Sequence, residues 1–417
     1  MPLLRILSLL VLGALIWTSS RAGFARLLTA YAVKDGVLEA ADEAVRIEPG
    51  DADAHLVRGD LFAAADDLAA AIKEYEQASI ERPNDYVSWL SLARARELIG
   101  ESASALEAAN RAVALAPSYA QPRWQLGNVL IRSGRRDEGF RELSRAAAYD
   151  PSLWPSIIDL AWQISHGNIE FVKQSVPPQS VGLTVALAEY LAKRGAVAEA
   201  VSMLRIAGTG DDAIAARQKY VGELLAQGHF SEAAVLWNLD HKDERVSLGE
   251  LLDGRFEQER SLDGVGFDWR SPNRSPNVLL ALDTNGSHDG RSSLLVEFKG
   301  ESNPGNPIIA QLILVEPHAH YALRLSVQTE NLISGGLPEV NVVDAGSNKV
   351  LASTGTLPKQ TNGWREYSID FTSLDSTNAI RVVVQRQQCS NGPCPIFGKL
   401  WLDNFILEKP QVPKSKD

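Results

Sequence analysis

Residues 71–83 read Ala71-Ile-Lys-Glu-Tyr75-Glu-Gln-Ala78-Ser-Ile-Glu-Arg-Pro83, and this stretch decides the fold because its key positions recur at a fixed distance. A proline stands every 34 residues, an alanine stands five residues before each proline, and a small residue stands 24 residues before it. A fixed period of this length predicts a stacked array of one repeated unit. The three series are Pro49, Pro83, Pro117 and Pro151; Ala44, Ala78, Ala112 and Ala146; and Ala25, Gly59, Ala93 and Gly127.

Each period predicts one pair of antiparallel helices. Two helices can cross closely only where one of them lacks a bulky side chain, which explains the small residues at two fixed phases. The prolines stand where one helix must stop or the next must start. Trp89, Leu92 and Ala93 lie on the first helix of one unit, and Ala105 and Ala109 lie on its second helix.

These spacings resemble the tetratricopeptide repeat. The resemblance rests on Trp89-x2-Leu92-Ala93, Leu126-Gly127 and Leu160-Ala161, together with Ala71-x3-Tyr75-x2-Ala78-x4-Pro83, and it covers about residues 20–165. It implies an α-solenoid with a groove for a peptide or protein partner. The sequence departs from the pattern at Arg58, Arg96 and Gly139, which indicates a diverged array. Trp89, Trp124, Trp154 and Trp162 are interpreted as core between the repeats.

Weaker units follow the clear ones. Val176-Pro177-Pro178 ends any helix. Beyond this break the period shortens to about 33, with Gly195 and Gly228 closing first helices. The solenoid is therefore predicted over residues 23–245, with degenerate units at about 180–240.

The amino terminus predicts export. Arg5 precedes an apolar run from Ile6 to Trp17, and this pattern is typical of a signal peptide or an uncleaved signal-anchor helix within residues 1–22. An ordinary buried helix is the third alternative. Export predicts a periplasmic or extracytoplasmic location, and retention of the segment would make the inner membrane a partner.

The chain changes character beyond about Glu250, where short alternating or β-branched runs replace the helical period. We expect an antiparallel β-sandwich of jelly-roll type over residues 247–409 and a disordered tail over 410–417. The fold class is therefore multidomain α plus β. The expected strands are Asn277–Asp283, Ser293–Gly300, Pro307–Glu316, Tyr321–Glu330, Glu339–Asp344, Trp364–Thr372, Ala379–Gln385 and Lys399–Leu407.

Two signatures in this region resemble carbohydrate-binding modules with a galactose-binding-like fold: Leu252-Asp-Gly-Arg-Phe-Glu257 at the start, and Leu400-Trp-Leu-Asp403-Asn-Phe-Ile-Leu407 at the end. The resemblance implies a structural calcium ion between the first and last strands, with Glu257 and Asp403 as ligands. The alternative is that Asp403 satisfies backbone groups at a strand end. Sugar binding would use an exposed ring with a polar neighbour, and the candidates are Trp269 with Arg270 and Trp364 with Arg365. The alternative for each ring is the core.

Cys389 and Cys394 flank a short Ser-Asn-Gly-Pro loop. In an exported chain this spacing predicts a disulfide hairpin. Zinc would need two more ligands, and redox catalysis favours two residues between the cysteines.

Composition limits the function. The chain has 417 residues, 45% of them hydrophobic, and a net charge of −11, which argues against nucleic acid as a partner. No phosphate loop, dinucleotide fingerprint or nucleophile elbow occurs. The sequence therefore predicts an exported scaffold without catalytic activity or a required cofactor, and export of this architecture is typical of bacterial cell-envelope or exopolysaccharide assembly. The alternatives are a polysaccharide-processing enzyme or subunit and a structural spacer.

Overall fold

The computed structural model of the protein describes residues 2–259, 262–389 and 393–410. It divides into two compact units, residues 1–179 and 180–417. The division falls directly after the Val176-Pro177-Pro178 break. Most of the predicted tail, residues 411–417, lies outside the described residues.

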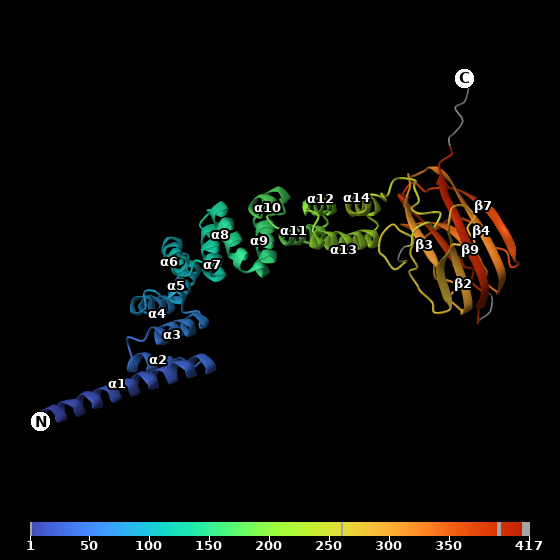
Figure 1. Ribbon diagram of the computed structural model, residues 1–417. Coiled ribbons are helices and arrows are strands. Elements are labelled where there is room, and N and C mark those ends of the chain that lie inside the picture. The colour runs from blue at the N-terminus through green and yellow to red at the C-terminus, as the bar shows by residue number, and fades with distance from the viewer. Residues whose placement is uncertain (1, 260–261, 390–392, 411–417) are drawn as a thin grey trace, which may run out of the picture. The chain divides into compact units, whose positions relative to one another are not determined.

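The first unit is an array of paired helices that follow one another along the chain (Figure 1). Helices α3 to α8 form three pairs, each of which closes at one of the periodic prolines. The short 3-10 helix η1 begins at the last of these prolines. The helices are α1 (Pro2–Asp35), α2 (Leu38–Ile47), α3 (Ala52–Ala64), α4 (Leu68–Glu81), α5 (Tyr86–Leu98), α6 (Ser102–Leu115), α7 (Ala120–Arg132), α8 (Arg136–Tyr149), η1 (Pro151–Leu153), α9 (Trp154–Ile164) and α10 (Ile169–Ser175).

The small residues at fixed phases lie where the helices touch. Ala78, Ala93 and Ala112 are completely buried. A Cβ atom on Gly59 would come within 2.6 Å of the Tyr75 ring, so the aromatic residue of α4 fills the space that this glycine leaves on α3. Aspartates accept hydrogen bonds from the first backbone N–H groups of α3 and α5, and this capping explains where these helices start. The predicted helix pairs are confirmed.

Gly139, which departs from the repeat pattern, has a steric reason. A Cβ atom on Gly139 would lie 2.4 Å from Cγ1 of Ile131 and 2.8 Å from the carbonyl oxygen of Gly127. Gly127 and Gly139 thus face each other across α7 and α8, and both helices lack a side chain at the crossing point. The pair approaches too closely for the alanine that stands at this phase in the preceding unit, Ala105.

Replacing Gly139 with alanine is expected to lower the free energy of unfolding by about 1–2 kcal/mol, because the backbone of α7 cannot move away from the new methyl group without parting the two helices. Chemical denaturation followed by circular dichroism measures the change. Gly23→Ala on α1, where a Cβ atom meets nothing within 4 Å, is the control and should be neutral or slightly stabilising. Equal effects of the two substitutions would contradict the steric explanation.

Helix α1 is continuous from the apolar amino-terminal segment into the first repeat unit. Its later part packs on α2 through the buried residues Ala25, Thr29 and Ala32, and Arg21 donates a hydrogen bond to the carbonyl of Ile47. The side chains of Leu12, Ile16 and their neighbours are exposed. Within the described part of the chain, no helix combines the length and apolar character needed to cross a membrane.

The second unit joins two helix pairs to the β-sandwich. Gly195 and Gly228 follow the first helix of each pair, as predicted. Trp237 of α14 packs edge-on against Phe267 at a centroid distance of 5.9 Å, and a Cβ atom on Gly266 would lie 2.0 Å from its ring. These helices, predicted to belong to the solenoid, therefore lie in one compact unit with the sandwich. They are α11 (Val181–Lys193), α12 (Val197–Ile206), α13 (Asp211–Gln227) and α14 (Phe230–Asp240).

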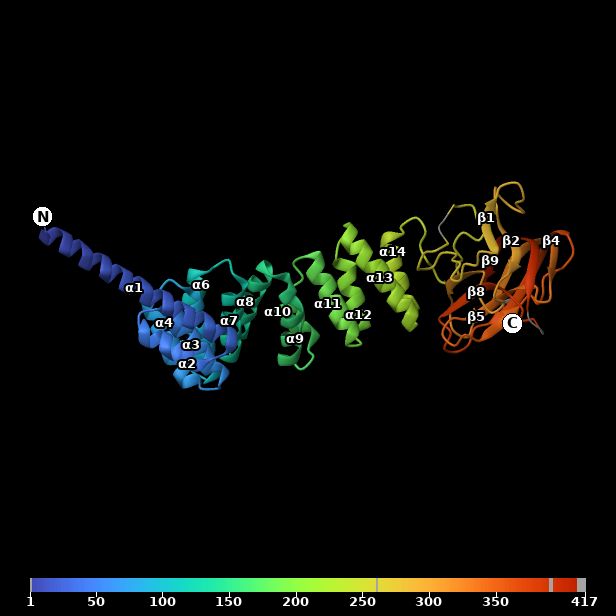
Figure 2. The same ribbon diagram turned by 90° about the horizontal axis from the view of Figure 1, so that it is seen from below.

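Two antiparallel sheets enclose the core of the sandwich (Figure 2). The five-stranded sheet has the order β1-β2-β9-β4-β7, and the four-stranded sheet has the order β3-β8-β5-β6. Alternate residues such as Val296, Leu325 and Val382 point into one shared core. The strands are β1 (Val278–Asp283), β2 (Ser293–Glu301), β3 (Ile309–Leu314), β4 (His320–Ser334), β5 (Pro338–Asp344), β6 (Val350–Ser353), β7 (Asn362–Thr372), β8 (Ala379–Arg386) and β9 (Pro395–Glu408). All eight expected strands are present, and among the strands of the described residues only β6 was not predicted.

Candidate functional site

A side chain six residues after each of three periodic prolines binds the proline carbonyl. Nε2 of His55 lies 3.0 Å from the oxygen of Pro49, Nε1 of Trp89 donates to Pro83 at 3.0 Å, and Nε of Arg123 donates to Pro117 at 2.8 Å. Three chemically different side chains thus form the same bond at the same phase. They hold the start of each first helix to the turn before it. Trp89 remains partly buried against the core between the repeats, as predicted.

His55 also joins a charged cluster between α3 and α4. Its Nδ1 lies 2.7 Å from Oε2 of Glu74, whose Oε1 accepts from Arg58 at 2.6 Å. Both ring nitrogens of His55 face groups that can only accept, so the protonated ring fits best. The hydrogen bond to Glu74 raises the pKa of His55. Burial raises the pKa of Glu74, but the bonds from His55 and Arg58 outweigh it and leave that pKa lowered.

The stability contributed by this cluster should depend on pH. Because the pKa of His55 is raised, its contribution is complete below the ordinary value of 6.5 and is lost as pH rises through the folded-state pKa. The Glu74 contribution is present above 4.5 and is lost as pH falls. Between pH 4.5 and pH 6.5, we expect the free energy of unfolding of the wild type to exceed that of His55→Gln by about 1.5 kcal/mol. At pH 8 the difference should be smaller. Urea denaturation across this range measures the difference, and a difference independent of pH would contradict the charged pair.

Helix α5 offers a mixed apolar and charged face that the packing does not use. Val87, Arg94 and Leu98 are spaced by seven and four residues, so they lie on one side of the helix. Val87 is 36% exposed and Leu98 is 57% exposed, whereas the opposite side buries Leu92 and Ala93. Exposed apolar side chains grouped around a charge are typical of protein-binding surfaces.

Trp269 and Arg270 do not form the predicted sugar site. Trp269 is buried between Phe256 and Phe405, and its Nε1 donates to the carbonyl of Asp253. Its ring therefore has no free face for a sugar. The backbone of Arg270 exchanges two hydrogen bonds with Ala310 and extends the edge of the four-stranded sheet. The core alternative is the one that the structure favours for Trp269.

Trp364 and Arg365 also fail to form one site, because successive residues of β7 point to opposite faces of the sheet. Trp364 is partly exposed on the outer face, where the His288 ring meets it edge-on at 5.4 Å. Arg365 is exposed and donates to the side chain of Asn362. Trp364 alone keeps the accessible ring that stacking on a sugar requires.

Glu257 and Asp403 hold one loop, but their surroundings do not suit calcium. Oδ2 of the buried Asp403 accepts from the backbone N–H groups of His288 and Asp289, and Oδ1 accepts from that of Asn404. Glu257 accepts in the same way from the backbone of Arg291 at 2.7 Å. These donors already occupy most of the lone pairs that a cation would need. The geometry therefore favours the backbone-satisfying alternative for Asp403.

The pKa of Asp403 and the distribution of potential metal ligands agree with the assignment of Asp403 to backbone hydrogen bonding. Burial raises the pKa of Asp403 despite the N–H groups around it. Within residues 2–259, 262–389 and 393–410, no three His, Cys, Asp or Glu side chains are grouped so as to hold a metal ion.

Cys389 and Cys394 form a disulfide, with Cα atoms 6.0 Å apart. Residues 390–392 of the loop between them lie outside the described part of the chain. The buried side chain of Arg386 contacts this bridge. It is 1% exposed and donates hydrogen bonds to the carbonyl oxygen and to Sγ of Cys394. It also donates to Gly336, Ser302 and Ser334, so one side chain joins three loops.

Maleimide labelling of the native protein without reductant is expected to modify neither cysteine. The double substitution Cys389→Ala/Cys394→Ala should lower the free energy of unfolding by only about 2 kcal/mol, because the loop it opens is short. Mass spectrometry and denaturation measure the two effects. Two reactive thiols in the native protein would contradict the bond.

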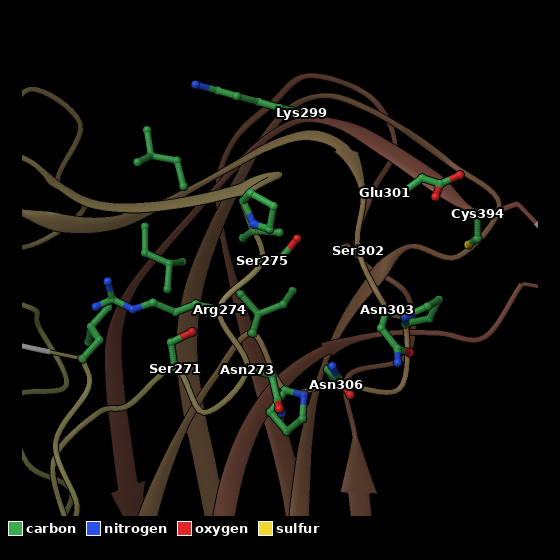
Figure 3. A pocket seen from close by; sticks show the side chains of 18 of the residues that line it. Ser271, Asn273, Arg274, Ser275, Lys299, Glu301, Ser302, Asn303, Asn306 and Cys394 are labelled. Atoms are coloured by element: carbon green, nitrogen blue, oxygen red, sulfur yellow. The ribbon is translucent and has the colours of Figure 1, made fainter.

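A hollow of about 960 Å³ lies beside this bridge (Figure 3). Leu280 and Ile308 supply apolar lining, and the polar lining consists mainly of amide and hydroxyl groups. The arrangement offers both hydrogen-bond donors and acceptors, with few charges. Its polar residues are Ser271, Asn273, Arg274, Ser275, Lys299, Glu301, Ser302, Asn303 and Asn306.

Sequence reasoning missed this hollow and the proline-carbonyl bonds. The carbonyl bonds carried a signal, because His55, Trp89 and Arg123 share one phase of the period and all can donate. The hollow carried none, since its residues come from segments far apart in the chain. Arg386 ends strand β8, which also contains Arg381 and Gln385, and the sequence gives no sign that Arg386 is the buried one.

No family model matches the chain. It is 32% identical over 94 residues to small glutamine-rich tetratricopeptide repeat-containing protein 2 of Mycosarcoma maydis, covering 22% of this chain and 27% of that protein. It is 28% identical over 102 residues to DnaJ homolog subfamily C member 3 of Mus musculus, covering 24% and 20%. The matches thus span about a quarter or less of these relatives.

Two solved structures are similar to the helical part at low scores. MamA from Desulfovibrio magneticus RS-1 has 17% identity and a TM-score of 0.31, covering 45% of this chain and 93% of that one. The second tetratricopeptide domain of Spaghetti (RPAP3), solved with the HSP90 peptide SRMEEVD, has 18% identity and a TM-score of 0.23, covering 24% and 92%. The helix pairs of period 34 and the sequence match to a tetratricopeptide repeat protein together identify the helical part as tetratricopeptide-like.

Proposed function

We propose that the protein is a scaffold without catalytic activity, which binds protein partners through the first helices of its repeat units. The observation that carries this proposal is the α5 face, where Val87, Arg94 and Leu98 are not used in packing the array. Helix pairs stacked in this way contact only their neighbours and leave such faces free for a partner.

Capture by the full-length protein tests this proposal. Immobilised wild type is incubated with an extract of the source cells, and bound proteins are identified by mass spectrometry. Val87→Asp/Leu98→Asp should lose the specific partners while its melting temperature stays unchanged. Capture of no protein, or equal capture by both forms, would reject the proposed function.

We further propose that the chain works outside the cytoplasm, in bacterial cell-envelope or exopolysaccharide assembly. The apolar run from Ile6 to Trp17 and the disulfide support this location. Sequencing the amino terminus of the protein recovered from each cell fraction tests it, and recovery in the cytoplasm with an intact Met1 would oppose export.

A second proposed function is carbohydrate binding by the sandwich, read as a jelly roll. The polar hollow supports it, because Asn273 and Asn306 offer amide groups that suit the hydroxyls of a neutral sugar. The exposed part of Trp364 is the competing location. Glycan-array binding by the full chain, by Asn273→Ala/Asn306→Ala and by Trp364→Ala separates the two locations. The absence of any glycan signal would remove carbohydrate from the proposal.

A further inference from the structure

Helix α8 carries a pair of exposed arginines that its counterparts lack. Arg141 and Arg145 stand one helical turn apart on the exposed side of the second helix of the fourth pair. The residues at the same two phases are Glu107 and Arg111 on α6, Lys73 and Gln77 on α4, and Glu39 and Glu43 on α2. The two positions are both cationic only on α8, and we call Arg141 and Arg145 the α8 arginine pair.

The α8 arginine pair lies between two hollows and lines both. The first, of about 290 Å³, lies against α6 and α7, where Leu106, Leu126 and Leu130 line it. The second, of about 580 Å³, lies against α10 and includes Phe140 and Phe171, whose rings meet edge-on at 5.9 Å. An extended segment crossing α8 at the arginine pair would therefore have a hollow on either side, and the partly buried Phe171 gives the second hollow accessible apolar lining.

Nearby carboxylates do not neutralise the pair. Glu142 is shared between Arg145 and Arg123, which lies 2.8 Å from it, and Glu138 is held by Arg135. Among the described residues, Arg141 has no hydrogen bond or ion pair with another side chain, although its charge contributes to lowering the pKa of Glu138. The side chain of Arg145 is 61% exposed. Asp137 is the remaining acidic residue of the second hollow. The site thus keeps free positive charge on a chain whose net charge is −11.

We propose that the α8 arginine pair binds an acidic peptide segment of a protein partner, with two carboxylates on the guanidinium groups and an apolar side chain in an adjacent hollow. A guanidinium can bind a carboxylate through two parallel hydrogen bonds, which gives the site direction as well as charge. The second hollow adds apolar burial beside the charged contact, through Phe171. This inference rests on the proposed function and assigns it a second surface, on the second helices, away from the α5 face.

Fluorescence anisotropy with a labelled glutamate-rich peptide containing one leucine tests the proposal on the full-length protein. Arg141→Glu/Arg145→Glu should weaken binding by about tenfold or more, because like charges then face each other. The matched control Lys73→Glu/Arg111→Glu changes the net charge equally at the same helical phases and should stay within about twofold of wild type. Melting temperatures check that both variants fold.

A twin peptide with glutamine in place of every glutamate should not bind. Equal binding of the twin, or an equal loss in the control variant, would overturn the proposal by showing that no specific charge pairing occurs. Absence of peptide binding to wild type would overturn it as well. In that case, partner capture that still depends on Val87 and Leu98 would leave the proposed function standing, so the two failures are distinguishable.

Discussion

Replacing Arg217 with alanine is expected to lower the free energy of unfolding of the second unit by about 3–5 kcal/mol. The guanidinium of Arg217 is 2% exposed, and it donates from Nε and Nη2 to both oxygens of Asp240, at 2.8 and 2.5 Å. Its Nη1 donates to the carbonyl of Gly208 at 2.8 Å. Alanine would leave a buried carboxylate without its counter-charge, so the cost comes mainly from Asp240.

Chemical denaturation followed by tryptophan fluorescence measures this loss. Lys219→Ala is the matched control on the same helix, since it removes an exposed ion pair with Glu189 and should cost less than about 1 kcal/mol. Removing both charges with Arg217→Met/Asp240→Leu should cost less than Arg217→Ala alone. Similar effects of Arg217→Ala and Lys219→Ala would show that the Asp240 carboxylate is not stranded.

Arg386→Ala is expected to lower the stability of the sandwich by about 3 kcal/mol. Unlike Arg217, Arg386 has no carboxylate partner in the part of the chain that the structure describes. Its loss therefore strands acceptors instead of a charge, namely the carbonyls of Ser302, Gly336 and Cys394. Each buried acceptor without a donor costs about 1–3 kcal/mol, and water entering the space would reduce the sum. Thermal and urea denaturation of the full chain measure the effect.

Two variants sharpen the Arg386 prediction. Arg386→Lys keeps the charge but cannot reach all three loops, so it should recover less than half of the loss. Arg365→Ala, on the exposed edge of the same sandwich, should cost less than about 0.5 kcal/mol. Full recovery of stability by lysine would mean that the positive charge, and not the number of hydrogen bonds, explains how Arg386 stabilises the sandwich.

Periodicity allowed most of the fold to be predicted. The prolines and small residues that repeat every 34 positions located the helix pairs, because close crossings impose residue size at fixed phases. Strand alternation located eight of the nine strands that the described residues contain. Strand β6, Val350–Ser353, was too short to show alternation. The attachment of α14 to the sandwich depends on a contact between Trp237 and Phe267, and neither residue carries a periodic signal for it.

The candidate sites were predicted less well, for a geometric reason. Trp364 and Arg365 were predicted to form one sugar site because they are adjacent in the sequence. In a β-strand, however, the side chains of adjacent residues point to opposite faces of the sheet. Glu257 and Asp403 were predicted as calcium ligands between the first and last strands, but backbone N–H groups from residues 288–292 donate to their oxygens. Only the cysteine pair, whose partners are close in sequence, could be read from spacing alone.

The bonds to the proline carbonyls have a consequence for how repeat arrays are built. An imidazole, an indole and a guanidinium all serve at this junction, so what the joint requires is a donor of sufficient reach and not a particular residue. These side chains could therefore be exchanged between units, which would change the chemistry of the surface at the junction and keep the hydrogen bond to the proline carbonyl.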